Sequence, residues 1–179
     1  LERSVVIPFI LFVKRCCMGK CTGISFVDSM LFRVCRNQRI HMHKVFKGIA
    51  QRGQCSMGWF YGFKLHLICN EMGELLSFMV TPGNVDDREP LKNKTFVELL
   101  FGKLVGDKIL LRKRAIIETI NDELKHIAQI EPSRHRSVTG CTVNLMAGLA
   151  AYSFFPKKPM IAVERIEPEE NGLIQLSLF

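Results

Sequence analysis

Two apolar runs joined by five residues constrain the fold of this chain more than any other feature. Trp59 to Cys69 is rich in aromatic and β-branched residues with partial alternation, and Leu75 to Thr81 follows after the connection Asn70 to Glu74. Two such runs separated by a short connection that contains Gly are typical of a β-hairpin. A third apolar run, Gly23 to Leu31, predicts a strand next to this hairpin, so we expect an antiparallel meander of three strands.

A single carboxylate, Asp28, lies within the predicted strand from Gly23 to Leu31, although buried strand positions rarely hold an acid. No Asp or Glu occurs from Ser29 to Asn70. The basic residues in this window are Arg33, Arg36, Arg39, Lys44, Lys47, Arg52 and Lys64. An isolated acid followed by a basic segment suggests a carboxylate that binds a metal while its surroundings bind a polyanion. Alternatively, Asp28 caps a turn or pairs with a nearby Arg, since structural ion pairs are common.

The length and charge of the chain indicate one globular domain with an acidic partner. A chain of 179 residues is long enough for one core and too short for two domains. The formal net charge of +8 favours a partner such as nucleic acid. The seven cysteines are odd in number and irregularly spaced, which argues against a disulfide framework and indicates a reducing cytoplasm. Zinc ligation would use Cys17, Cys21, His41 and His43, but their spacing matches no common zinc finger, so ordinary cysteines are favoured.

The two ends of the chain differ in composition from its centre. Residues 1–22 read as an apolar, Cys-rich leader, and its apolar run from Val5 to Val13 is too short for a membrane span of about 20 residues. We therefore expect no membrane anchor. Because the sequence begins with Leu1 and not Met, we expect that an upstream part is missing. The tail, residues 156–179, is expected to be loosely ordered.

The second half of the chain predicts a turn, a helix, a strand and two more helices. Thr81 to Asn84 predicts a turn, and the segment from Asp86 to Pro90 predicts the start of a helix that reaches about Phe101. Capping accounts for Asp86 and Asp87 better than metal binding does. A short strand from Lys103 is then expected to present Asp107 at its carboxyl end.

A helical period follows from Arg112 to Ile130. The expected buried stripe contains Ile116, Ile120, Leu124 and Ile127. Arg114, Glu118 and Lys125 fall on a different face. That face is either part of a site or a solvated surface with an i,i+4 Arg–Glu pair. A second apolar helix, from Val138 to Phe154, is expected to pack in the core through Met146, Leu149, Ala150 and Tyr152.

Three acids from separate parts of the chain, Asp28, Asp107 and Glu118, are candidates for one metal site. Hard cations such as Mg²⁺ prefer carboxylate oxygens, and clustered acids repel one another unless a cation neutralises them. Two such ions can activate the attacking oxygen and stabilise the leaving oxygen of a phosphodiester. The sequence therefore suggests metal-assisted phosphoryl transfer on a nucleic acid.

An ordered series of motifs, over roughly residues 20 to 155, resembles the catalytic domain of bacterial DDE insertion-sequence transposases. The motifs are Phe26-Val27-Asp28-Ser29, the Gly58–Pro82 hairpin, Thr81-Pro82-Gly83-Asn84-Val85-Asp86-Asp87-Arg88, Val105-Gly106-Asp107-Lys108 and Arg114-x3-Glu118-x6-Lys125. The resemblance implies an α/β, ribonuclease-H-like fold: a mixed sheet, with a three-strand antiparallel meander and a further strand, flanked by helices. It also implies that Asp28, Asp107 and Glu118 are catalytic and bind Mg²⁺, with Mn²⁺ as a substitute, to nick and rejoin DNA at the ends of a mobile element.

The same resemblance implies the remaining expectations about domains, partners and location. Residues 1–22 would be the remnant of an N-terminal region, residues 23–155 the catalytic domain and residues 156–179 a tail. The residues expected to bind DNA are Arg33, Arg36, Arg39, Lys44, Lys47, Arg52, Arg114 and Lys125. DNA is the expected partner, a homodimer is possible, and the location would be the bacterial cytoplasm at the nucleoid.

Two departures from the family pattern suggest that this chain is shortened. Glu118 follows Asp107 by only 118 − 107 = 11 positions, where the family has many tens of residues with a strand and a helix. This suggests an internal deletion whose join lies between Lys108 and Leu111, and Leu111 stands at the family's Tyr position. Only 27 residues precede Asp28. The leading hypothesis is a shortened and impaired transposase; the alternatives are a non-catalytic DNA-binding remnant and a pseudogene product with no role.

Overall fold

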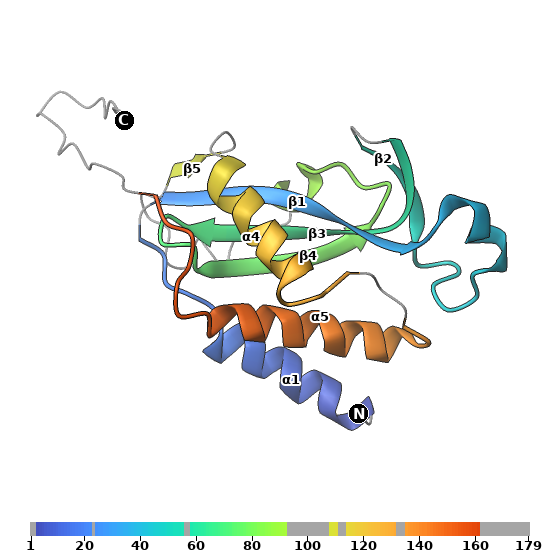
Figure 1. Ribbon diagram of the computed structural model, residues 1–179, viewed down its shortest axis with the longest axis horizontal. Helices are drawn as coiled ribbons and strands as arrows, with labels where there is room; N and C mark the ends of the chain where they lie inside the picture. Colours follow the sequence, from blue (N-terminus) through green and yellow to red (C-terminus); the bar gives the residue numbers. More distant parts are fainter. Residues whose placement is uncertain are drawn as a thin grey trace, which may run out of the picture.

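The fold is a mixed α/β arrangement around one sheet, seen in a computed structural model (Figure 1). The structure describes residues 3–22, 24–55, 58–92, 108–110, 114–131 and 135–161. The strands are β1 (Ile24–Cys35), β2 (Gln51–Cys55), β3 (Gly58–Asn70), β4 (Leu75–Pro82) and β5 (Lys108–Leu110). The helices are α1 (Arg3–Cys16), the 3-10 helix η1 (Asn37–Met42), α2 (Glu89–Lys92), α4 (Arg114–His126) and α5 (Val138–Ser153).

The long strand β3 organises the sheet. It pairs antiparallel with β1 along one edge, and with β2 and then β4 along the other. β5 lies outside β1 and runs parallel to it, with Lys108 opposite Ile24. The predicted hairpin, the three-strand antiparallel meander (β1, β3, β4) and the α/β class are confirmed. A further strand is present as β5, but the segment expected to form it, Lys103 to Asp107, lies outside the described residues.

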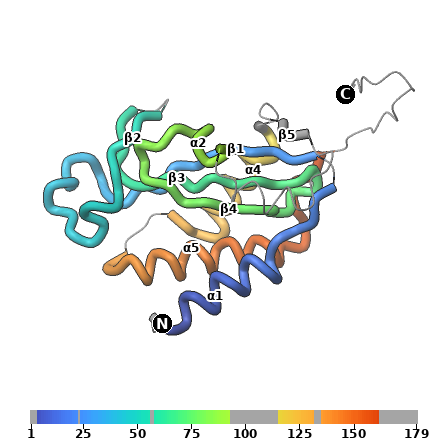
Figure 2. Tube along the Cα trace, turned by 180° about the vertical axis from the view of Figure 1, so that it is seen from behind, coloured from blue at the N-terminus to red at the C-terminus, as the bar shows by residue number. Residues whose placement is uncertain are grey.

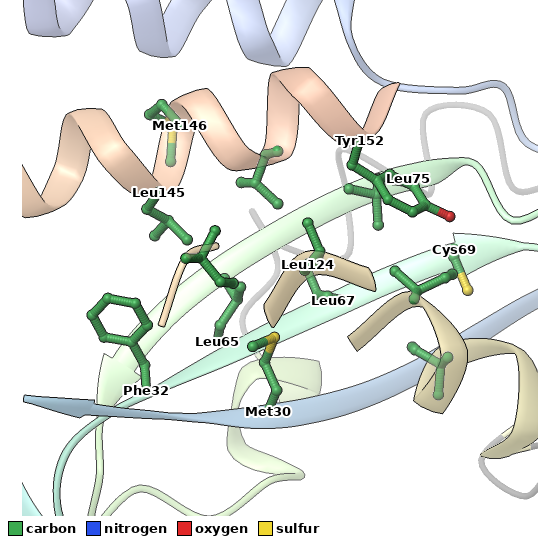
Figure 3. Close-up of a cluster of buried hydrophobic side chains, with 14 of the residues drawn as sticks. Met30, Phe32, Leu65, Leu67, Cys69, Leu75, Leu124, Leu145, Met146 and Tyr152 are labelled. Atoms are coloured by element: carbon green, nitrogen blue, oxygen red, sulfur yellow. The ribbon is translucent and has the colours of Figure 1, made fainter. Parts of the chain in front are cut away.

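Alternation along the strands separates a helix-covered face from an opposite face. Phe26, Met30 and Phe32 of β1 are buried in the core formed with α4 and α5 (Figure 3). Leu124 of α4 and Tyr152 of α5 belong to the same core. The segment that includes α2 lies on the opposite face, where Asp87 reaches Ser29 and Lys64. Side chains at even positions of β1, including Asp28, therefore share the face covered by α4.

The predicted stripe of α4 is correct at three of its four positions. Ile116, Ile120 and Leu124 are buried, whereas Ile127 is 63% exposed. The prediction for Ile127 is wrong because α4 ends at His126, so the helical period no longer sets the direction of the next side chain. Ile117 is buried in its place. In α5 the predicted core positions Met146, Leu149, Ala150 and Tyr152 are all buried.

Residues 3–16 form the helix α1, which packs against α5 (Figure 2). Phe9, Ile10 and Val13 face the core, and this packing stabilises the helix although Pro8 removes one backbone donor from it. The sequence predicted an apolar segment here without assigning it a helix, and the structure shows that residues 3–16 of this segment are helical. Among the helices of the described residues, none has both the length and the apolar character needed to cross a bilayer.

Gly53 lies inside β2, although Gly48, Gly53 and Gly58 suggest that this part of the chain consists of loops. A Cβ at Gly53 would overlap the carbonyl oxygen of Gly83 and approach Phe60 Cε1 to 2.6 Å. The absence of a side chain therefore lets the turn after β4 lie directly on β2.

Replacing Gly53 with Ala is expected to lower the free energy of unfolding by about 2 kcal/mol, because backbone atoms would have to move apart. Urea unfolding of both proteins measures this difference. Gln54→Ala, at an exposed position of the same strand, is the control and should change stability by less than about 0.5 kcal/mol. Equal stability of the Gly53→Ala variant and the parent would contradict the close approach to Gly83.

Candidate functional site

Asp28 lies in the middle of β1, opposite Leu67 of β3, and is half-buried on the face covered by α4. The side-chain amide of Asn121 on α4 donates a hydrogen bond to Asp28 Oδ2 over 3.3 Å. Glu118 lies three residues before Asn121 on the same helix and is exposed. Residues three apart on a helix have Cβ atoms about 5–6 Å apart. Glu118 therefore lies within one helical turn of Asn121, the residue through which α4 contacts Asp28.

Asn121 is a residue of this site that no sequence motif identified. It is only 7% exposed, and its Oδ1 atom is buried with no hydrogen-bond partner among the described residues. A buried amide oxygen without a partner is unfavourable, and amide oxygens are also ligands of hard cations. The signal in the sequence is a polar residue next to an apolar stripe, three positions after the candidate Glu118.

The third candidate acid, Asp107, and the predicted strand from Lys103 to Asp107 lie outside the described residues. The described strand β5 begins at Lys108, opposite Ile24. Asp28 lies four residues further along β1, roughly 13 Å away at about 3.3 Å per residue. The convergence of the Asp28 and Asp107 carboxylates therefore stays a prediction. The predicted helix from Asp86 to about Phe101 is described only up to Lys92, where α2 ends.

Within the described ranges, no three His, Cys, Asp or Glu side chains form a group that could hold a metal ion. These ranges include Cys17, Cys21, His41 and His43, but they do not include Asp107. The oxygen donors around Asp28 fit a hard cation in type: a carboxylate, an unpartnered amide oxygen and a nearby exposed carboxylate.

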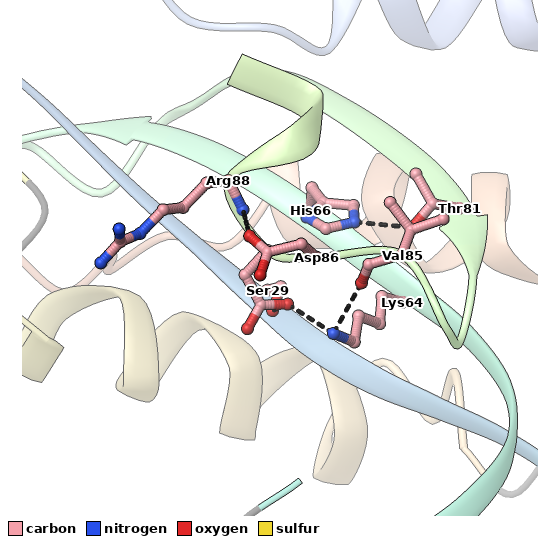
Figure 4. Close-up of polar contacts among 8 residues, drawn as sticks. Ser29, Lys64, His66, Thr81, Val85, Asp86 and Arg88 are labelled. Atoms are coloured by element: carbon pink, nitrogen blue, oxygen red, sulfur yellow. Dashed lines mark hydrogen bonds and ion pairs between the residues drawn. The ribbon is translucent and has the colours of Figure 1, made fainter. Parts of the chain in front are cut away.

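The opposite face of the sheet carries a polar cluster that fastens the segment after β4 to the strands (Figure 4). Lys64 Nζ lies 2.9 Å from Asp87 Oδ1 and donates to the carbonyl oxygen of Val85 over 2.8 Å. Ser29 Oγ donates to the same Asp87 oxygen over 2.7 Å. Lys64 is only 8% exposed, so it is not available to DNA. Its place among the seven basic residues expected to surround a polyanion is therefore wrong.

The two adjacent acids Asp86 and Asp87 have different roles. Asp86 Oδ1 accepts the backbone N–H of Arg88 over 2.8 Å, which is the predicted capping role. Asp87 does not cap; it forms the ion pair with Lys64. Burial, the largest single cause, would raise the pKa of Asp87, but the hydrogen bonds from Lys64 and Ser29 and the positive charge of Lys64 together lower it.

His66 lies next to this cluster and is almost completely buried, with 1% of its surface exposed. Its Nε2 is 2.7 Å from Thr81 Oγ1 on the neighbouring strand. Burial, as the largest cause, lowers the pKa of His66 to about 4; the nearby Lys64 acts in the same direction, and Asp87 opposes it. His66 is therefore neutral at pH 7 and serves as a hydrogen-bonding group of the sheet.

The other residues expected to bind DNA are spread along one end of the sheet and along α4. Arg36, Arg39 and Lys44 line a cleft of about 820 Å³ beside η1. Arg33, Lys47 and Arg52 are exposed, and Lys125 on α4 is half-buried. Arg114 is the first residue of α4. Several cations are thus accessible to a polyanion, and three of them share one concave surface.

The family of the chain is shown by a comparison with known protein families. The family described as "Transposase DDE domain" matches the chain over residues 18–109 and over residues 105–138. These matches cover more than half of the chain, so the chain belongs to this transposase family. The mixed sheet flanked by helices is compatible with the ribonuclease-H-like fold expected for it. No significant match was found among curated proteins or among solved structures.

None of the seven cysteines, all of which lie in the described part of the chain, forms a disulfide. Cys17, Cys69 and Cys141 are buried in the core. Burial raises the pKa of the Cys69 thiol to about 12 and that of Cys141 to about 11, so both thiols stay protonated. These cysteines act as small apolar core residues.

Proposed function

We propose that this chain is the catalytic domain of an insertion-element transposase in which Asp28, Asp107 and Glu118 bind Mg²⁺ or Mn²⁺. The observation that carries the proposal is the hydrogen bond from Asn121 to Asp28, because it brings α4 to the carboxylate of β1 within one turn of Glu118. Bound divalent cations supply activation of the attacking oxygen and stabilisation of the leaving oxygen at a phosphodiester.

The protein side chains have distinct tasks in this proposal. Asp28 and Glu118 provide carboxylate oxygens from a strand and a helix that are held together by the core. Asn121 orients the Asp28 carboxylate by donating to one of its two oxygens. Exposed basic side chains bind the phosphates on either side of the reacting bond. DNA at the element's ends and at the target is the proposed substrate.

We also propose that catalysis by this shortened chain is impaired. The two segments matched by the family meet at residues 105–109, next to the expected join between Lys108 and Leu111. The short strand β5 pairs with the beginning of β1 and not with the part that carries Asp28. Because this pairing leaves β5 away from Asp28, it also favours the second candidate function, a DNA-binding remnant without metal chemistry.

Binding of Mn²⁺ tests the metal site directly. The parent chain is expected to bind Mn²⁺ weakly, and Asp28→Asn should weaken this binding about tenfold or more without unfolding the domain, since it removes a charged ligand. Paramagnetic resonance of free Mn²⁺ during a titration gives the affinity. Asp86→Asn is the matched control, because it also removes one carboxylate charge but lies on the opposite face. Equal Mn²⁺ affinities of the Asp28→Asn variant and the parent would remove Asp28 from the site.

Binding of duplex DNA tests the basic segment. Affinity is expected to depend weakly on sequence and to fall steeply with salt, because each neutralised phosphate releases counterions. Replacing Arg36, Arg39 and Lys47 with Ala should flatten the slope of log affinity against log salt by roughly 0.9 for each phosphate that is no longer neutralised. Fluorescence anisotropy between 50 and 200 mM salt, a range typical for such titrations, measures the slope. An unchanged slope would exclude these three residues from the interface.

A further inference from the structure

The cleft beside η1 is formed by two segments that are distant in the sequence. One side comes from the end of β1 and from η1, with Arg36, Arg39 and His43. The other side comes from the residues just before α5, His135 and Arg136, which belong to no motif of the sequence. No acidic residue is among the described residues that line the cleft. Its walls therefore carry positive charge from both sides.

Two histidines in the cleft leave a ring nitrogen without a hydrogen-bond partner. Nε2 of His43 and Nε2 of His135 are both buried and unpartnered among the described residues. The His43 ring is fixed by stacking on Phe46, with centroids 5.5 Å apart, and by an edge contact with Tyr61. Unpaired buried polar atoms are unfavourable and are normally satisfied by a ligand or a water molecule. Because both Nε2 atoms are shielded from solvent, the two histidines shape the wall of the cleft, and the arginines supply its accessible charge.

The N-terminus of α5 adds further positive potential to the same wall. Ser137 caps this helix by accepting the backbone N–H of Gly140, and its first turn contains no acid. The N-terminal end of a helix carries a partial positive charge, which here lies directly after Arg136. One carboxylate lies next to the cleft: Glu131 accepts the backbone N–H of Arg33, the neighbour of the cleft residue Val34, over 2.8 Å. The cleft consequently suits an anion better than a neutral ligand.

The position of the cleft relates it to Asp28. Val34, which lines the cleft, is buried in the same core as Met30 and Phe32 and so lies on the Asp28 face of the sheet. Asp28 and Val34 are six positions apart in β1, roughly 20 Å at about 3.3 Å per residue. Along duplex DNA this length corresponds to roughly six base pairs, at about 3.4 Å per step. Since Met30 and Phe32 lie between these two residues and are buried in the core, this is a distance along the strand and not a free path for the duplex.

We propose that this cleft is a second phosphate-binding site, about 20 Å along β1 from Asp28, which holds the backbone of duplex DNA through Arg36, Arg39 and Arg136, with His43 and His135 in its walls. The inference rests on the proposed action on DNA and adds to it a specific anchoring place formed by two segments. In this arrangement the cleft fixes the direction of the duplex relative to the Asp28 site and takes no part in the chemistry.

The test compares two double variants that each remove two positive charges. Arg39→Ala with Arg136→Ala removes a cation from each side of the cleft, whereas Arg88→Ala with Lys157→Ala removes exposed cations elsewhere. The probe is a 20-base-pair duplex of arbitrary sequence, about two helical turns long. The cleft variant is expected to reduce the slope of log affinity against log salt by about 2, and the control variant is expected to keep the slope of the parent chain. Arg39→Lys with Arg136→Lys keeps the charges and should restore most of the slope, which separates the removal of charge from misfolding.

Histidine ring resonances provide an independent readout on the parent chain. Addition of the duplex is expected to shift the ring signals of His43 and His135 and to leave those of His66, on the opposite face, in place. The cleft is excluded if the duplex binds but the cleft variant keeps the parent slope, or if both double variants show the same reduction in slope. If the parent chain binds no DNA, the proposed function fails, and the cleft proposal fails with it.

Discussion

Lowering the pH from 8 to 4 is expected to destabilise the folded chain by about 3 kcal/mol through His66 alone. Burial lowers the pKa of His66 to about 4 in the folded state, whereas an unfolded histidine has a pKa near 6.5. Between these two values the unfolded chain binds a proton that the folded chain does not. The contribution of His66 is therefore fully present above about pH 6.5 and is lost as the pH falls towards 4.

Urea unfolding at several pH values between 8 and 4 measures this effect. His66→Gln should remove most of the pH dependence in that window, because the amide can still bond with Thr81 but does not titrate. His126→Gln, at an exposed position at the end of α4, is the matched control and should leave the profile almost unchanged. Parallel profiles of the parent and the His66→Gln variant would contradict the assignment to His66.

Asp87 affects the stability of the fold in a separate, more acidic pH range. Its pKa is lowered in the folded chain, so its contribution is present above the unfolded value near 3.9 and is lost as the pH falls below it. The Asp87 side chain is 61% exposed, so solvent screening keeps this contribution small. The two groups can thus be distinguished by the pH at which stability changes.

The sequence predicts the centre of the sheet well because its signals there are local. Alternation and a Gly-containing connection specify β3 and β4 without knowledge of the rest of the fold. β2 was not predicted because Gln51–Cys55 has no apolar alternation, and its strand conformation depends on pairing with β3. Gly53 is a loop signal in the sequence, but in the fold it makes room for the carbonyl oxygen of Gly83. Strand pairing and close approaches of this kind depend on the tertiary fold and leave no pattern in the local sequence.

The polar partners of Asp28 and Asp87 could not be predicted from the sequence. Lys64 looks like one more cation of a basic segment, and only the fold brings it to Asp87, 23 residues later. Asn121 carries no charge and belongs to no recognisable motif, yet it is the residue that connects α4 to Asp28. Spacing on a helix predicts which side chains share a face, but it does not say which strand that face meets.

The second large effect concerns catalysis: the chain as it stands is expected to show no DNA nicking or joining above background. Metal-assisted phosphoryl transfer requires its ligands within about half an ångström of the productive geometry, and correct positioning supplies much of the rate. The start of β5 pairs with Ile24, roughly 13 Å along β1 from Asp28. Asp107 directly precedes β5 in the sequence and lies outside the described residues, so its convergence with Asp28 stays a prediction.

Reach is not the obstacle to activity, because the residues between Asp107 and Arg114 can span the distance at roughly 3.3 Å each. We expect the obstacle to be the placement of Asp107 relative to the other two acids, because α4 itself packs on β1 and in the core. Purified chain with Mn²⁺ and DNA that carries the element's ends should therefore give no more nicked or joined product than the Asp28→Asn variant. Cleavage that depends on Asp28 and Glu118 would show instead that the short connection forms a working site.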